Sequence, residues 1–167
     1  YCSWYLELSK VVLTDTASSP QLLRGTRRTL VRVLETILRL LHPIIPFITE
    51  EIWQRVAVFA AKSGDTIMLQ PYPQPQQEKI NLTATDEMKQ VMAIISGIRN
   101  IRGELNIEPG KRFPVYLQGT TAQDRQLLEK HKVYLLTLAK IERIRCLDQD
   151  ESEPESATAL VNNLKIL

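Results

Sequence analysis

The sequence is poor in the residues that build metal centres and disulfide frameworks. Its 167 residues include two cysteines, Cys2 and Cys146, which lie far apart and form no CxxC pair, and two histidines, His42 and His131. Closely spaced cysteine pairs are the usual sequence signal of a zinc site or a disulfide scaffold. The composition therefore predicts neither a metal site nor a disulfide.

Long apolar runs and a strong excess of one charge are also missing. No run reaches the roughly 18–20 consecutive apolar residues that a membrane helix needs, and no signal peptide is visible. We therefore expect a cytoplasmic monomer that does not contact membranes. Lysine and arginine number 21 against 19 acidic residues, a net charge of +2. A nucleic-acid surface would have to come from local clustering of basic side chains.

Motifs for catalysis are absent as well. The sequence has no glycine-rich phosphate loop, no nucleophile elbow and no HExxH pair. Glu50 and Glu51 are adjacent, so on a helix they point about 100° apart and cannot converge as an acid and a base. His42 precedes Pro43 at a helix break, which favours a structural role at that turn. The sequence predicts no catalytic residue and no cofactor within this chain.

Helical periodicity dominates the first two thirds of the sequence. Ser19 is a good N-cap and Pro20 a good first residue of a helix. Apolar residues at helical spacing predict helices over 1–13, 20–41, from the HPIIPF segment to about 60, and 84–106. The third of these is expected to bury Phe47, Ile48, Ile52, Val56 and Phe59. Because helical spacing of apolar residues already starts at Tyr1, we expect a fragment that lacks at least one preceding helix.

The pattern changes after Pro109 and Gly110. Residues 113–117 and 142–147 resemble strands, 122–139 a helix, and 159–167 a further strand, with an acidic loop at 148–156. We also expect a short extended piece near 66–69. The predicted fold is mainly α: an antiparallel helical bundle in a domain at 1–110, followed by a small α+β subdomain at 111–167.

Arginine side chains form a stripe on the second predicted helix. At 100° per residue, Arg24, Arg28, Arg32 and Arg39 fall within about 80° of one another, opposite most of the apolar residues. Glu35 lies inside this stripe. Two interpretations stay open: a ridge that contacts phosphates, or a solvated face with an ion pair from Glu35 to Arg32 or Arg39.

A second group of candidate residues lies near the first and fourth helices. Arg99 and Arg102 flank the apolar face of the fourth helix, where they either contact RNA or extend past the edge of the core. Trp4 and Tyr5 are aromatic side chains that stack on splayed bases or pack in the core. Leu6 lies off the apolar stripe of its helix and therefore needs a partner. We treat these five residues, with Arg24, Arg28 and Arg32, as RNA-binding candidates.

Several segments together resemble valyl-tRNA synthetases, a family of class I aminoacyl-tRNA synthetases. The runs SWYLELSK at 3–10, LRGTRRTLVRVLETILRLLHPIIPFITEEIWQRV at 23–56, TIMLQPYP at 66–73 and IRNIRGELNIEPGK at 98–111 follow the family's order. The HPxxPFxTEEIW pattern is shared with isoleucyl and leucyl enzymes. Cys2-Ser3 stands where the family commonly has Cys-Asp.

The resemblance implies a class I anticodon-binding bundle that grips the anticodon stem–loop of valine tRNAs. It implies a parent enzyme that attaches valine to tRNA with ATP and Mg²⁺ bound in other domains, and the rest of that synthetase as a partner. Two alternatives remain. One is the equivalent domain of an isoleucyl enzyme, against which the NIEPGK run and the lack of paired cysteines argue. The other is a helical protein-interaction module, which should expose an apolar patch rather than a basic face.

Overall fold

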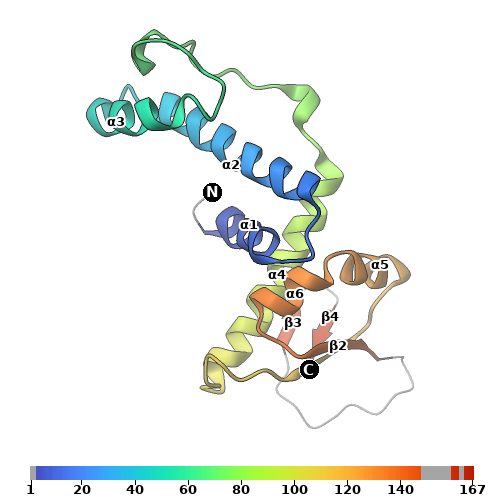
Figure 1. Cartoon of the computed structure of the whole chain (residues 1–167). Coiled ribbons are helices and arrows are strands. Elements are labelled where there is room, and N and C mark those ends of the chain that lie inside the picture. The colour runs from blue at the N-terminus through green and yellow to red at the C-terminus, as the bar shows by residue number, and fades with distance from the viewer. Residues whose placement is uncertain (1–2, 148–158, 162–163) are drawn as a thin grey trace. The chain divides into compact units, whose positions relative to one another are not determined.

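The computed structural model describes residues 3–147, 159–161 and 164–167, which fold into two compact units (Figure 1). The first, called the sheet unit below, comprises Tyr1–Val11 and Asn81–Leu167, and the second, called the α2–α3 unit, comprises Val12–Ile80. No described helix is both long and apolar enough to span a bilayer. The fold is mainly α with a small sheet, as the sequence predicts.

The α2–α3 unit is a pair of helices with an irregular tail. Most of helix α1 (Trp4–Thr14) belongs to the sheet unit. It is followed in the chain by α2 (Pro20–Leu41) and α3 (Pro46–Val56), and then by two short 3₁₀ helices, η1 (Ile67–Leu69) and η2 (Gln77–Lys79). The N-cap prediction is confirmed, because Ser19 Oγ accepts a hydrogen bond from the Leu22 amide at 3.2 Å. At the turn between α2 and α3, His42 Nδ1 lies 2.8 Å from Thr49 Oγ1.

The predicted buried face of α3 is only partly confirmed, because Ile52 packs against the core of this unit and Val56 is half-buried. Phe47, Ile48 and Phe59 are 90 %, 53 % and 77 % exposed, whereas Trp53 is 1 % exposed. Trp53 packs with Leu38, Ala57 and Ile67 in the core of this unit. This face carries the Trp53 indole, whose N–H donates to the buried Glu35 carboxylate of α2, a contact that apolar periodicity does not reveal. The extended piece expected near 66–69 is instead the 3₁₀ turn η1.

The sheet unit is built around α4 (Leu82–Glu104). Asn81 caps this helix, since its side-chain oxygen accepts from the Ala84 amide at 3.0 Å. The predicted apolar face of α4 is confirmed, and its fully buried residues form one core with strand and helix residues of the same unit. These α4 residues are Val91, Ile94, Ile95, Ile98 and Ile101. Leu105, which follows the last residue of the helix, is 55 % exposed.

Among the described residues, four short strands complete the sheet unit, in the order β2-β1-β4-β3. The strands are β1 (Pro114–Gln118), β2 (Arg143–Cys146), β3 (Ala159–Val161) and β4 (Leu164–Ile166). β1 pairs in parallel with β2 and antiparallel with β4, which forms a hairpin with β3. The expected single strand at 159–167 is therefore two strands. The acidic loop expected at 148–156 lies outside the described residues.

The connection from β1 to β2 contains two helices rather than the one predicted over 122–139. They are α5 (Ala122–Lys130) and α6 (Lys132–Leu138), and they meet at His131, whose φ of −109° and ψ of 14° are not helical. Because α4 and the sheet share one core, the compact units do not divide at residue 110. The assignment of domains to 1–110 and 111–167 stays a prediction.

Candidate nucleic-acid interface

The eight candidate residues fall into two groups, one in each unit. Arg24, Arg28 and Arg32 lie on α2, in the α2–α3 unit. The other five belong to the sheet unit: Trp4, Tyr5 and Leu6 on α1, and Arg99 and Arg102 on α4.

The α2 group is an exposed basic face. Arg24, Arg28 and Arg32 are all exposed, and so is the neighbouring Arg27. Within the part of the chain that the structure describes, none of these four guanidinium groups forms an ion pair or a side-chain hydrogen bond. Arg24 and Arg32 are eight residues apart, about 12 Å along the helix axis at 1.5 Å per residue. This face therefore presents a row of cations to solvent.

Arg39 belongs to a different environment although it shares the sequence pattern. Its Nε and Nη2 donate to the carboxylate of Glu35 at 2.8 and 2.9 Å, and its Nη1 donates to the Pro71 carbonyl at 2.6 Å. The Glu35 side chain is 1 % exposed and that of Arg39 is 12 % exposed. Of the two ion pairs considered, the structure forms the one with Arg39. Arg39 therefore holds the η1–η2 segment against α2 and is not part of the exposed face.

Arg99 links α1 to α4 within the sheet unit. Its Nη2 donates to Glu7 Oε2 at 2.8 Å, and its Nε and Nη2 both donate to the Leu138 carbonyl. Its guanidinium carbon lies 5.4 Å from the ring centroid of Trp4, within the range of a cation–π contact. Trp4 also packs against the core of this unit. The indole that was a candidate for base stacking is thus already stacked on an arginine.

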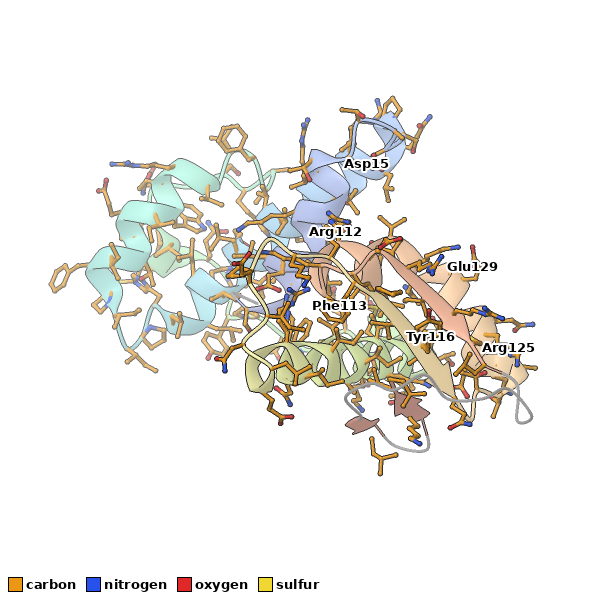
Figure 2. The ribbon with its side chains drawn as sticks, turned by 90° about the horizontal axis from the view of Figure 1, so that it is seen from below. Asp15, Arg112, Phe113, Tyr116, Arg125 and Glu129 are labelled. Carbon is orange, nitrogen blue, oxygen red and sulfur yellow. The ribbon has the colours of Figure 1, made fainter. Side chains whose placement is uncertain are left out.

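Arg102 has even fewer free donors. Its Nη1 donates to the carbonyls of Glu108 and Lys111, and its Nη2 to those of Ala139 and Lys140, at 2.8–3.3 Å. Its guanidinium carbon lies 4.8 Å from the ring centroid of Phe113, which Figure 2 labels just before β1. Four of the five N–H groups of this side chain are therefore used within the protein. Arg102 joins the end of α4 to the turns that precede β1 and β2.

A surface cleft of about 580 Å³ lies beside these two arginines. It is lined by Arg99, Arg102, Gly103, Asn106, Ile107, Glu108, Pro109, Leu138, Ala139 and Lys140. Asn106 and Lys140 were not among the residues predicted from the sequence, and they lie in separate turns. Both have a positive φ, 49° and 54°, but lysine gives no sequence signal for that conformation. On α1, Tyr5 and Leu6 are half-buried and do not line this cleft.

The two adjacent glutamates of α3 serve different partners, as their helical separation predicts. Glu50 accepts from the Thr66 hydroxyl at 2.6 Å and from the Ile67 amide, whereas Glu51 pairs with Arg55 at 2.5 Å. The hydrogen bond from Thr66 is the largest cause of a lowered pKa for Glu50. Within the described ranges, no group of three His, Cys, Asp or Glu side chains is arranged to hold a metal ion.

A mainly helical domain with a row of unpaired arginines on one exposed helix face is typical of proteins that bind nucleic acid through its phosphates. Residues 1–117 match the family model described as the anticodon-binding domain of tRNA ligase. The chain belongs to this family.

The names of similar proteins indicate which member of this family the chain resembles. The chain is 44 % identical over all 167 residues to proteins called valine–tRNA ligase from Legionella pneumophila, in the strains Lens, Paris and Philadelphia 1. It spans only 18 % of the length of each of these relatives. The similarity therefore concerns one region of a much longer protein.

Proposed function

We propose that this chain recognises the anticodon stem–loop of valine tRNAs as one part of a valine–tRNA ligase. The proposal is supported by membership of the anticodon-binding family and by whole-chain similarity to the Legionella enzymes. The observation that carries it is the exposed row formed by Arg24, Arg28 and Arg32. Guanidinium groups with no internal carboxylate remain available to phosphates, which supply most of the affinity for RNA.

The chemistry of aminoacylation belongs, in this proposal, to other parts of the parent enzyme. The chain spans 18 % of the length of its relatives, so we assign the binding of ATP, Mg²⁺ and valine to the remaining parts of the parent enzyme. The chain itself supplies tRNA binding and no catalytic residue, and it works in the cytoplasm as a monomer. An isoleucyl parent is disfavoured by the resemblance of the NIEPGK run to valyl enzymes and by the names of the similar proteins.

A pull-down from total tRNA tests this function directly. The 167-residue chain is immobilised, incubated with a complete tRNA pool, and the retained species are identified by sequencing. We expect enrichment of valine isoacceptors. Retention of all tRNAs equally would leave general RNA binding but refute anticodon recognition, and retention of none would refute the proposal. The same chain should show no valine-dependent exchange of pyrophosphate into ATP.

Exposed apolar side chains favour a second role for this chain, in contact with other parts of the parent enzyme. The α2–α3 unit exposes large apolar side chains around α3 and η1, including Phe47 at 90 % and Met68 at 71 %, which line a shallow groove together. Contiguous apolar surface usually marks a protein contact. We propose that the rest of the parent synthetase covers this groove. Phe47→Ser and Met68→Ser should weaken association with the remaining parent domains and leave RNA binding by the chain unchanged.

A further inference from the structure

The cleft at the C-terminal end of α4 has the size and lining of a ligand site. Its volume of about 580 Å³ lies within the roughly 300–1,000 Å³ common for small-molecule pockets. One part of its wall is apolar, with Ile107, Pro109 and Leu138. The polar part carries three cations, Arg99, Arg102 and Lys140, against one acid, Glu108, together with Asn106. Such a lining suits a ligand that combines a flat apolar body with a negative charge.

Three polar groups in this wall have hydrogen-bonding capacity to spare. Among the described residues, Nη1 of Arg99 has no acceptor and the side-chain amide of Asn106 has no partner. The Lys140 ammonium donates to one acceptor, the Pro109 carbonyl at 3.0 Å, and can donate three hydrogen bonds. Arg102 differs, because its Nη1 and Nη2 groups are used by backbone carbonyls. Arg102 therefore shapes the cleft, while the other three can bind a ligand.

The two turns of the cleft also share an uncommon backbone conformation. Asn106 and Lys140 have φ values of 49° and 54°, in the left-handed region. Asparagine tolerates this region, whereas lysine adopts it at an energetic cost. Such positions concentrate at binding sites, where the surrounding structure maintains them. Here the two turns are held by the Arg102 hydrogen bonds to Glu108 and Lys140.

We propose that this cleft holds a single unstacked nucleotide of an RNA loop. Its base would lie on the apolar wall, within reach of the Asn106 amide, and its phosphate would contact Arg99 and Lys140. Proteins read single-stranded loops by splaying out bases and contacting them individually, which a paired duplex does not allow. The inference rests on the proposed function, since the RNA loop is that of the tRNA anticodon, and it assigns a loop nucleotide to the sheet unit.

The two turns permit substitutions that preserve their conformation. Lys140→Asn removes the charge, and Asn106→Gly removes the side-chain amide. Asparagine and glycine both tolerate positive φ, so each turn can keep its conformation. Lys132→Gln is the matched control, because Lys132 is an exposed lysine of the sheet unit that pairs with Glu129 and does not line the cleft. Circular dichroism checks that each variant is folded.

Binding is measured with two RNAs: a stem–loop that carries a valine anticodon, and a blunt duplex of the same stem without a loop. We expect Lys140→Asn to weaken stem–loop binding about tenfold, as for loss of a charge-assisted hydrogen bond. Asn106→Gly should weaken it less, and neither variant should alter duplex binding. Photocrosslinking of 4-thiouridine placed in the loop should map to residues 103–109 or 138–140.

Several results would overturn the inference. If both cleft variants bind the stem–loop normally while Arg28→Ala weakens it, the cleft is not a nucleotide site and the proposed function survives. Equal weakening on stem–loop and duplex would make Lys140 a general phosphate contact. If free uridine monophosphate binds as tightly as the stem–loop, the cleft is a site for a free nucleotide and not for a nucleotide of an RNA loop. If no RNA binds the unchanged chain, the inference and the proposed function both fail.

Discussion

Trp53 donates its indole N–H to the carboxylate of Glu35 over 3.1 Å, and both side chains are 1 % exposed. The same carboxylate accepts two hydrogen bonds from Arg39, which also binds the Pro71 carbonyl. A buried carboxylate is tolerated only when its charge is paired and its oxygens are hydrogen-bonded. These contacts join α2, α3 and the segment after η1 into one unit.

Removal of Arg39 should destabilise the α2–α3 unit strongly. Arg39→Ala would leave the Glu35 charge buried without its cation, which typically costs about 3–5 kcal/mol. We expect the free energy of unfolding to fall by about 3 kcal/mol, because water can partly reach the site. Urea titration followed by the fluorescence of Trp53, in a Trp4→Phe background, measures this unit. Arg55→Ala, which breaks an exposed pair with Glu51, should change stability by less than about 1 kcal/mol. Equal effects of the two substitutions would contradict a stabilising role for the buried pair of Glu35 and Arg39.

Removal of one α2 arginine should reduce the salt dependence of RNA binding. Each phosphate contact in single-stranded RNA contributes about 0.7 to the slope of log affinity against log salt concentration. Arg28→Ala and Arg32→Ala should each flatten the slope by about this amount and weaken all tRNAs similarly. Filter binding at a series of salt concentrations provides both quantities. An unchanged slope in a folded variant would exclude these side chains from the interface.

Arg102→Lys should destabilise the sheet unit even though it keeps the positive charge. Lysine can donate three hydrogen bonds from one nitrogen and cannot match four carbonyls arranged around a planar group. Because two or more charge-assisted hydrogen bonds are lost, we expect a cost of about 2 kcal/mol. Thermal unfolding by circular dichroism, with Lys111→Arg as a charge-preserving control, would detect it. A variant as stable as the parent would mean that the carbonyl contacts contribute little.

The sheet unit should lose stability in acid through Asp124. Burial raises the pKa of this carboxyl, but hydrogen bonds from the Thr121 hydroxyl and amide and from Gln90 outweigh burial, so the pKa lies below its ordinary value of 3.8. Asp124 therefore binds a proton more readily in the unfolded chain than in the folded chain. The stabilisation is present above about pH 3.8 and is lost as pH falls through the lower folded-state pKa.

Asp124→Asn should therefore make unfolding of the sheet unit less dependent on pH between about pH 5 and 2. Denaturant titrations across this range, followed by Trp4 fluorescence in a Trp53→Phe background, measure the dependence. Asp86→Asn removes the same charge from an exposed side chain of α4 and should leave the dependence nearly unchanged. An identical loss of stability in acid for the parent and Asp124→Asn would show that other carboxyls govern it.

Elements governed by local sequence were predictable. The Ser19 cap and Pro20 fix the start of α2, and the isoleucine spacing of α4 fixes its buried face, because both signals lie within one turn or one helix. The exposed positions of Arg24, Arg28 and Arg32 follow from the same periodicity. The resemblance to valyl-tRNA synthetases identified the family from motif order, which composition and net charge do not show.

Features that depend on distant partners were not predictable. Periodicity assigned Phe47 to the core of α3, but the buried bond between Trp53 and Glu35 turns a different face inward. Arg99 and Arg102 have the sequence character of ligand-binding residues, yet their partners include backbone carbonyls more than thirty residues away in sequence. The cleft joins Asn106 to Lys140, and no spacing rule relates these two turns.

The charged pattern of β2 has a consequence for self-association. Among the described strands, β2 lies at one edge of the sheet, and Arg143 and Arg145 are exposed on it at alternate positions. The free edge of a sheet can pair with a strand of another molecule and so begin aggregation. Two like charges along this edge make such pairing between copies of the chain electrostatically unfavourable. β2 can thus remain at the rim of the sheet without nucleating intermolecular β-structure.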